Sequence, residues 1–225
     1  MKKQKIRLGN GCNYQCFYCR KYGRKEVPVS LEQVTARCEA AVLSGAAAVE
    51  FGGGEPLLYP ELAEAIRRAK AVEGIRHVSI FTNGSLLKSH VKELKEAGLD
   101  EINLHMDVPD ASAYARITGR SQILNGILDI IWSASVKDMA LTITVYLHKE
   151  SKPYLGVMAG LAKKFDVTIC FVELPDHSED CGLNEESVVK LLRKSFPDLE
   201  KKAEQTYGSS QLKGRIAFET LQDCM

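Results

Sequence analysis

Three cysteines near the start of the chain form a CxxxCxxC pattern after a short apolar run: Cys12, Cys16 and Cys19. Thiolates with this spacing can bind a cubane iron–sulfur cluster through three of its irons. Four cysteines normally complete such a cluster, so a tight trio leaves one iron open to a small ligand. The pattern therefore predicts a reactive [4Fe–4S] centre. The residues between the cysteines include Tyr14, Phe17 and Tyr18, which we expect to shield the cluster from water.

The alternatives for this motif are a structural zinc site and a chance group of cysteines. Structural zinc usually has four closed ligands in two pairs, and the other cysteines, Cys38, Cys170, Cys181 and Cys224, are scattered. Convergence of the last three on a second cluster is a further alternative, but their spacing matches no compact ligand pattern. We interpret them as ordinary thiols, and Cys38 as a core residue.

Two further motifs contain groups suited to binding a small ligand. Residues 52–56 read Gly-Gly-Gly-Glu-Pro, and residues 82–84 read Thr-Asn-Gly. Glycines allow the backbone to approach a ligand closely, and hydroxyl and amide groups suit a ribose diol. The alternative interpretations are a glycine-rich turn after a strand and a simple Asn-Gly turn.

Charged and imidazole side chains follow the later apolar runs. His105 and Asp107 stand at the end of the fourth run and are candidate ligand contacts, although Asp107 could instead cap the next segment. Arg116 could pair with a carboxylate or phosphate, or be solvated at a helix end. His148 and His177 follow the fifth and sixth runs, where each is either a proton-transfer candidate or a solvated residue on the rim of the site.

Apolar or β-branched runs alternate with amphipathic runs of helical period, which is typical of βα units around a parallel sheet. Strands are expected at residues 5–8, 48–51, 77–81, 101–105, 141–147 and 167–173. Helices are expected at residues 31–43, 60–72, 86–97, 123–136 and 154–165. These units predict an α/β fold, a partial (βα)6 TIM-like barrel in a single domain. Residues 1–183 form its core, and residues 184–225 form a short C-terminal extension of helix and strand. Chemistry in such folds collects at the carboxyl ends of the strands, where every motif above falls.

Local signals mark the ends of several helices. Ser30 is a predicted N-cap with Gln33 three residues later, which is the pattern of a capping box. Gly45 and Gly98 stand just past two predicted C-termini, and Pro60 stands in a predicted first turn.

Composition excludes several classes of protein. With 225 residues, 45% hydrophobic content and a formal charge of +1, the chain suits a compact domain with a substantial core and is not a basic nucleic-acid binder. Seven cysteines without a signal peptide indicate metal or redox chemistry in a reducing compartment, so we expect a cytoplasmic protein. No long apolar span predicts a transmembrane helix.

The order and spacing of the three motifs resemble the radical S-adenosylmethionine (SAM) superfamily. This resemblance implies a partial barrel and a [4Fe–4S] cluster whose fourth iron binds the amino and carboxylate groups of SAM. One electron then cleaves SAM into methionine and a 5′-deoxyadenosyl radical. The implied metal ligands are Cys12, Cys16 and Cys19. The expected SAM contacts are Gly52, Gly53, Gly54, Glu55, Thr82, Asn83, His105, Asp107 and Arg116. No catalytic residue is assigned.

Within that superfamily, residues 12–19, 97–103, 116–120 and 169–174 resemble the MoaA-like GTP cyclases of molybdenum-cofactor biosynthesis. The chain departs from that family at positions expected to contact ligand. The departures are Gly11 for arginine, His105 for serine, Thr142 for lysine, Cys170 for arginine and Pro175 for methionine. Cations bind phosphates tightly, so their loss weakens the case for GTP as substrate. The C-terminal second-cluster region of those cyclases has no counterpart in this sequence.

The sequence therefore predicts a radical SAM enzyme that abstracts hydrogen from a small molecule, such as a nucleotide or sugar, or from a peptide. It would need a flavodoxin- or ferredoxin-type reductant, and its oligomeric state is left open. One alternative is a MoaA-like GTP cyclase fragment in cofactor biosynthesis. The other is a non-catalytic iron–sulfur protein that transfers electrons or acts as a sensor.

Overall fold

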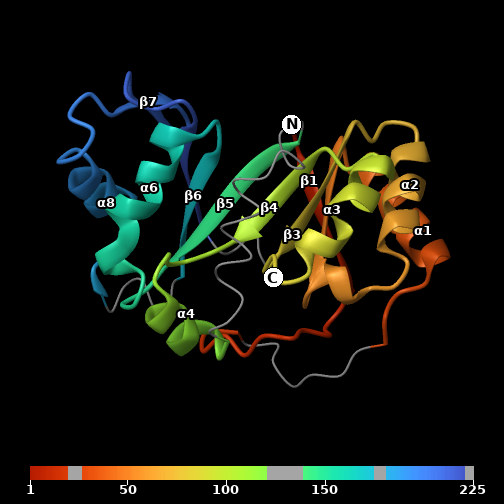
Figure 1. Ribbon diagram of the computed structural model, residues 1–225. Helices are drawn as coiled ribbons and strands as arrows, with labels where there is room; N and C mark the ends of the chain where they lie inside the picture. The colour runs from red at the N-terminus through yellow and green to blue at the C-terminus, as the bar shows by residue number, and fades with distance from the viewer. Residues whose placement is uncertain (20–26, 121–138, 175–180, 221–225) are drawn as a thin grey trace. The chain divides into compact units, whose positions relative to one another are not determined.

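The computed structural model describes residues 1–19, 27–120, 139–174 and 181–220 (Figure 1). These residues form two compact units, which we call unit 1 (Met1–Leu104 with Gln122–Ala140) and unit 2 (His105–Ser121 with Leu141–Met225). Several sequence predictions fall outside the described residues: the helix at 123–136, Pro175, His177 and Cys224.

Unit 1 contains parallel strands that alternate with helices. Strands β1 (Lys3–Gly9), β2 (Ala48–Gly53), β3 (His77–Thr82) and β4 (Glu101–His105) pair in chain order. The helices are α1 (Leu31–Leu43), α2 (Leu62–Ala71) and α3 (Leu87–Glu96), and they lie along one face of these strands (Figure 1). A single 3-10 turn, η1 (Pro56–Leu58), follows β2. Every predicted strand and helix of this unit within the described residues is therefore present.

Local chemistry sets the ends of these helices. The Ser30 side chain accepts from the backbone N–H of Gln33, and the Gln33 side chain accepts from the N–H of Ser30, so the predicted capping box is confirmed. Gly45 and Gly98 follow helices with φ of +82° and +93°, a conformation that favours glycine. The prediction of a helix start at Pro60 is wrong by two residues, because the turn after η1 delays α2 to Leu62.

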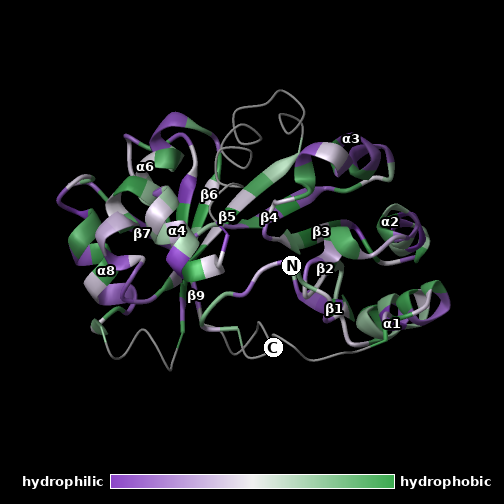
Figure 2. Cartoon of the chain, turned by 60° about the horizontal axis from the view of Figure 1, so that its bottom comes forward, coloured by the Kyte–Doolittle hydropathy of each residue, from purple (hydrophilic) through white to green (hydrophobic). Residues whose placement is uncertain are grey.

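A row of apolar side chains crosses the four strands of unit 1. Ile6, Phe51, Ile80 and Ile102 lie side by side in the sheet and are almost fully buried. Helix residues complete this core, including Cys38, which was predicted there and is fully buried. Figure 2 shows hydrophilic residues interleaved with hydrophobic ones on α2 and α3, as expected for helices that bury one side only.

Unit 2 begins with α4 (Ala111–Thr118), a helix that the sequence analysis did not assign. It continues with β5 (Ala140–Leu147), the 3-10 turn η3 (Lys152–Tyr154), α6 (Leu155–Lys164) and β6 (Thr168–Glu173). The last described elements are α8 (Glu185–Leu192), β7 (Glu200–Ala203), β8 (Thr206–Gly208) and β9 (Arg215–Thr220). Strands β5, β6 and β9 are parallel, and β8 and β7 add antiparallel strands beside β9. Within residues 184–220 the predicted mixture of helix and strand is thus present, while the domain boundary at residue 184 stays a prediction.

None of the helices in the described part of the chain is both long enough and apolar enough to cross a membrane.

Candidate functional site

The three predicted cluster ligands lie in the loop that follows β1, which we call the cluster loop (residues 9–19). Cys12 and Cys19 are exposed, Cys16 is half-buried, and none of the three forms a disulfide. The N–H of Cys19 donates to the carbonyl of Cys16 at 2.9 Å, which forms a tight turn between them. Among the described residues, no three His, Cys, Asp or Glu side chains surround a single point closely enough to bind one metal ion. A cubane binds each cysteine through a different iron, so its three thiolates need not converge on one point.

The glycine motif after β2 holds the cluster loop against the sheet. The N–H groups of Gly54 and Glu55 donate to the carbonyls of Gly9 and Gly11 at 2.9 and 2.7 Å. A Cβ atom on Gly53 would lie 2.2 Å from the Gly9 oxygen, and one on Gly54 would lie 2.1 Å from the Gly11 oxygen. Gly53 also has a φ of +131°. These two positions therefore require glycine, because any side chain would push the cluster loop away from β2.

Glu55 is a buried brace between the motifs. Its Oε1 accepts from the Thr82 hydroxyl at 2.6 Å and from the N–H of Leu57 at 3.0 Å, and its Oε2 accepts from the N–H of Asn83 at 2.8 Å. Burial raises the pKa of Glu55, although these three donors act in the opposite direction. The Thr82 hydroxyl, which is also buried, accepts from the N–H of Gly84 at 3.0 Å. Glu55 thus connects the end of β2 to the end of β3.

A closed ring of hydrogen bonds joins the cluster loop to the end of β3. The Asn83 Nδ2 donates to Asn13 Oδ1 at 2.9 Å, the Asn13 Nδ2 donates to the Ser85 hydroxyl at 2.8 Å, and the Ser85 N–H donates to Asn83 Oδ1 at 2.9 Å. Sequence reasoning missed Asn13 and Ser85. The only signal for Asn13 was its place inside the cysteine motif, and for Ser85 its place after the Asn-Gly turn.

The sulfur of Cys12 receives two N–H groups at this junction. The backbone N–H of Tyr14 lies 3.4 Å from Cys12 Sγ, and the Asn83 Nδ2 lies 4.0 Å from it. Although the residue as a whole is exposed, neighbouring atoms partly remove water from the Cys12 sulfur, which raises the pKa of the thiol, and both N–H groups oppose that change. Of the predicted aromatic shield, Tyr14 is buried while Phe17 is 51% exposed. Of these two rings only Tyr14 is withdrawn from solvent here, and the shielding of a bound cluster stays a prediction.

In unit 2 a buried carboxylate is flanked by two imidazoles. Asp107 Oδ1 lies 3.0 Å from His105 Nε2 and accepts from the N–H of Tyr146 at 2.7 Å, and Asp107 Oδ2 lies 3.2 Å from His148 Nε2. Burial alone would raise the pKa of Asp107, but the charge of His105 and the hydrogen bonds of both histidines hold it well below its usual range. The His105 ring also packs on the Tyr146 ring, with centroids 4.5 Å apart. Asp107 caps no helix, because the N-cap of α4 is Asp110.

The prediction of His148 as a solvated rim residue is wrong, because only 1% of it is exposed. Its ring is held on both sides, by Asp107 at Nε2 and by the N–H of Ser151 at Nδ1. The loop after β5 turns back at Ser151, whose hydroxyl also accepts from the His148 N–H at 3.0 Å. This turn buries the ring instead of presenting it to solvent.

Arg116, the predicted cation beyond β4, lies on α4 in unit 2. Its Nε and one terminal nitrogen donate to Glu150 Oε2 at 3.1 and 2.9 Å. The Arg116 side chain is 60% exposed. The guanidinium of Arg116 is therefore already paired with a carboxylate of the protein itself.

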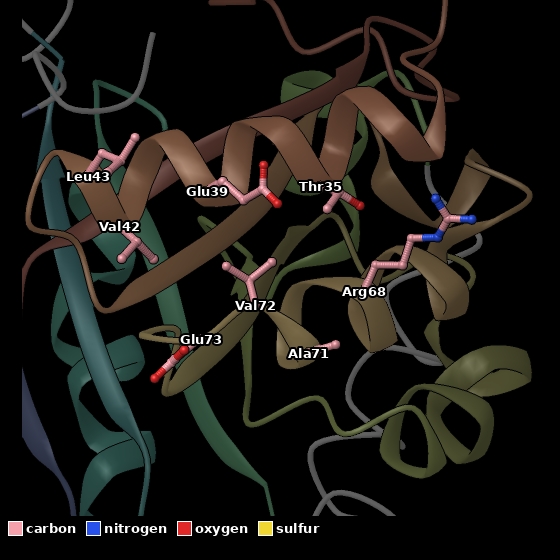
Figure 3. Close-up of a pocket in the computed structure, with 8 residues that line it drawn as sticks. All are labelled: Thr35, Glu39, Val42, Leu43, Arg68, Ala71, Val72 and Glu73. Carbon is pink, nitrogen blue, oxygen red and sulfur yellow. The ribbon is translucent and has the colours of Figure 1, made fainter.

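A pocket of about 650 Å³ lies on the outer side of unit 1, between α1 and α2 (Figure 3). Residues of both helices line it, among them Val42 and Glu39 from α1 and Arg68 from α2. It contains none of the motif residues. The cysteine, glycine and Thr-Asn-Gly motifs of unit 1 gather instead around the carboxyl ends of β1, β2 and β3.

The residues at this edge suit a [4Fe–4S] cluster. Three cysteines of the right spacing, none of them in a disulfide, lie on one loop. Two N–H groups point to the sulfur of one of them, and glycines at positions 53 and 54 leave room for that loop. Hydrogen-bonded cysteine ligands of this kind are typical of iron–sulfur sites.

Comparisons with known proteins agree with this interpretation. The family model described as "Radical SAM superfamily" matches residues 6–159. A GTP 3′,8-cyclase of Chlorobaculum tepidum is 32% identical over 206 residues, which cover 87% of this chain and 62% of that protein. A GTP 3′,8-cyclase of Lactiplantibacillus plantarum is 35% identical over 177 residues, which cover 75% of this chain and 53% of that protein. The chain thus spans between half and two thirds of the length of these two relatives.

Solved structures show the same fold at low identity. The SAM-bound structure of SuiB from Streptococcus suis has a TM-score of 0.67 and 16% identity, and the match covers 97% of this chain and 50% of that one. Methylornithine synthase (PylB) has a TM-score of 0.64 and 15% identity, with 85% of this chain and 61% of that chain covered. The predicted fold class, an α/β partial barrel of six βα units, is confirmed. From its motifs, its fold and the family match, the chain belongs to the radical SAM superfamily, whose cofactors are a [4Fe–4S] cluster and SAM.

Proposed function

We propose that this protein is a radical SAM enzyme that abstracts hydrogen from a small-molecule or peptide substrate. The observation that carries the proposal is the junction in unit 1, where the cluster loop is bound to the ends of both β2 and β3. The backbone of Gly54 and Glu55 binds the loop on one side, and the Asn13–Asn83–Ser85 ring binds it on the other. A carrier that only transfers electrons would not need the glycine motif at this place.

Each part of this edge has a distinct task in the proposal. Cys12, Cys16 and Cys19 would hold the cluster, which when bound and reduced supplies the electron for cleavage of SAM into methionine and a 5′-deoxyadenosyl radical. The backbone carbonyls of the glycine motif are the candidate acceptors for the SAM ammonium, because the N–H groups of Gly54 and Glu55 already bind the loop. Glu55 would act as a brace that keeps this loop rigid.

The remaining predicted SAM contacts are proposals that the geometry refines. Thr82 already bonds Glu55 and Gly84, so it would shape the site instead of reaching the ribose. His105 is held by Asp107 and is the less buried of the two imidazoles on that carboxylate, with 11% of its side chain exposed. Arg116 would reach SAM only by exchanging its bond to Glu150.

We propose a flavodoxin- or ferredoxin-type protein as the electron donor and the cytoplasm as the compartment. A reduced cluster and free thiols require a reducing environment, which supports both.

A GTP cyclase-type reaction is the second candidate, favoured by the identity to GTP 3′,8-cyclases over three quarters or more of this chain. The missing cationic residues argue against it. Gly11, Thr142 and Cys170 stand where those cyclases have arginine or lysine, and they cannot form an ion pair with phosphate. The chain matches only 62% and 53% of the length of these two relatives, so the match does not support their complete reaction in this protein. GTP is therefore the first substrate to test, and other nucleotides and sugars follow.

The deciding experiment is anaerobic reconstitution with iron and sulfide, followed by dithionite reduction in the presence of SAM. We expect about four iron atoms per chain and formation of 5′-deoxyadenosine. Cys16→Ala should lose both the cluster and the product. Cys181→Ala is the matched control, because it removes a cysteine outside the cluster loop, and it should keep both.

Binding of SAM to the reduced cluster provides a second readout that needs no substrate. We expect SAM to change the electron paramagnetic resonance spectrum of the reduced wild-type protein. If the protein holds a full cluster but SAM does not change its spectrum and no 5′-deoxyadenosine forms, the proposal of a radical SAM enzyme is rejected. The alternative of an electron carrier or sensor is then favoured.

A further inference from the structure

Hydrogen bonds within the protein fix the orientation of the Asn83 side-chain amide. Asn83 is only 8% exposed, and its Oδ1 accepts from the backbone N–H of Ser85. A backbone N–H can only donate, so the oxygen must face Ser85 and the amide nitrogen must face the cluster loop. The same logic orients Asn13, whose Oδ1 receives the Asn83 amide.

The two hydrogens of the Asn83 amide therefore have different acceptors. One is donated to Asn13 Oδ1 at 2.9 Å, and the other is left for Cys12 Sγ at 4.0 Å. That sulfur already receives the Tyr14 N–H at 3.4 Å. Both hydrogens of the Asn83 amide are thus directed at the protein, and neither is left for a ribose oxygen.

We propose that Asn83 is a positioning residue for the cluster, which donates an N–H···S hydrogen bond to the Cys12 thiolate and so sets the reduction potential. This inference rests on the proposed function, in that the cluster loop must hold a [4Fe–4S] cluster. It replaces the expectation that Asn83 binds the SAM ribose.

The direction of the effect follows from electrostatics. Reduction adds negative charge to the cluster and to its thiolates, and a donor at the sulfur stabilises that added charge. Loss of the donor therefore makes the potential more negative. The bond acts on Cys12 alone among the three ligands, since in the described part of the chain the hydrogen bonds of Asn83 include no other cysteine.

The test is an anaerobic redox titration of reconstituted protein without SAM, monitored by electron paramagnetic resonance. Asn83→Ala removes the donor, and we expect a shift to more negative potential at full iron content. Asn13→Ala is the matched control: it breaks the same ring but leaves the Asn83 amide and its bond to Ser85, so its potential should stay close to the wild-type value. SAM affinity, measured on the same samples, should change by less than about tenfold in either variant.

Several results would overturn the inference. The first is a wild-type reduction potential in Asn83→Ala that carries a full cluster. The second is an equal shift of the potential in Asn13→Ala. The third is a SAM affinity of Asn83→Ala that falls by more than about tenfold while its potential is unchanged. The last result would restore the ribose role.

A second measurement uses the wild-type protein and covers the case in which Asn83→Ala retains no cluster. Labelling of asparagine side chains with ¹⁵N should reveal a nitrogen coupled to the reduced cluster in pulsed paramagnetic resonance, and the absence of any such coupling would reject the bond. Failure of the wild type to bind any cluster would instead reject the proposed function itself.

Discussion

The backbone N–H of Ser151 lies 3.3 Å from Nδ1 of His148 and donates to it. Nδ1 must then carry the lone pair, so the ring proton resides on Nε2, which faces Asp107 Oδ2 at 3.2 Å. The imidazole is therefore held as one tautomer between a turn and a buried carboxylate. This arrangement makes His148 a structural residue of unit 2.

Removal of the His148 ring should destabilise the protein. In His148→Ala, Asp107 loses a buried donor and a cavity forms, so we expect the free energy of unfolding to fall by about 3 kcal/mol. Urea denaturation followed by circular dichroism measures this change. His90→Ala, at a partly exposed position on α3, is the control and should change stability by about 0.5 kcal/mol or less. Equal losses in the two variants would show that the Asp107 pair contributes nothing.

The ionisation of Asp107 should make stability depend on pH. Its pKa is lower in the folded than in the unfolded protein. The carboxylate therefore contributes stability above the unfolded value of about 3.9, and this contribution is lost as the pH falls through the folded pKa.

Asp107→Asn isolates this contribution. The variant should be less stable than the wild type at pH 7, and the difference should shrink below about pH 4. Glu55, whose pKa is raised, titrates with the opposite sign but is present in both proteins, so it does not affect the comparison. Unfolding free energies from pH 3 to pH 7 test this, and a difference that is constant over the range would contradict it.

The sequence predicted elements best where a local signal marks their ends. Helix α1 was predicted at its observed bounds because Ser30 and Gly45 mark both ends. Helix α4 was missed although Asp110 caps its start and Gly119 follows it at a φ of +69°, because eight residues are too few to show a helical period.

The candidate site was predicted in part. The cysteine and glycine motifs are local patterns, so spacing alone located them. The ring of Asn13, Asn83 and Ser85 joins residues about seventy positions apart, and the burial of His148 depends on a turn at Ser151. No local pattern reports such contacts, because they arise only when the strands pair.

Substitution of Gly54 should loosen the cluster loop without unfolding the protein. In Gly54→Ala the new methyl group would meet the Gly11 oxygen at 2.1 Å, so the loop must move away from β2. We expect iron content after reconstitution to fall at least about tenfold, with little change in far-ultraviolet circular dichroism. Gly156→Ala, on α6, has no atom within 4 Å of the new methyl and should retain its iron. Full iron content in Gly54→Ala would show that the close approach is unimportant.

Arg116 should contribute little to stability. Its pair with Glu150 is largely exposed, and such pairs are worth about 0.5 kcal/mol or less. Arg116→Gln should therefore change the free energy of unfolding by no more than Arg67→Gln, which breaks an exposed pair with Glu64 on α2. A loss above about 1.5 kcal/mol would mean that Arg116 has a larger structural role.

The ring between Asn13 and Asn83 also bears on the order in which the protein is assembled. The three cluster cysteines occur within the first nineteen residues, but the groups that hydrogen-bond their loop, Gly54 and Asn83, are synthesised much later. A nascent chain in which these cysteines have been synthesised but β3 has not therefore lacks the hydrogen bonds that hold the loop. Iron delivered at that stage would meet a loop without its native shape, so we expect stable cluster retention only in chains that extend beyond Ser85, as truncated chains reconstituted side by side would reveal.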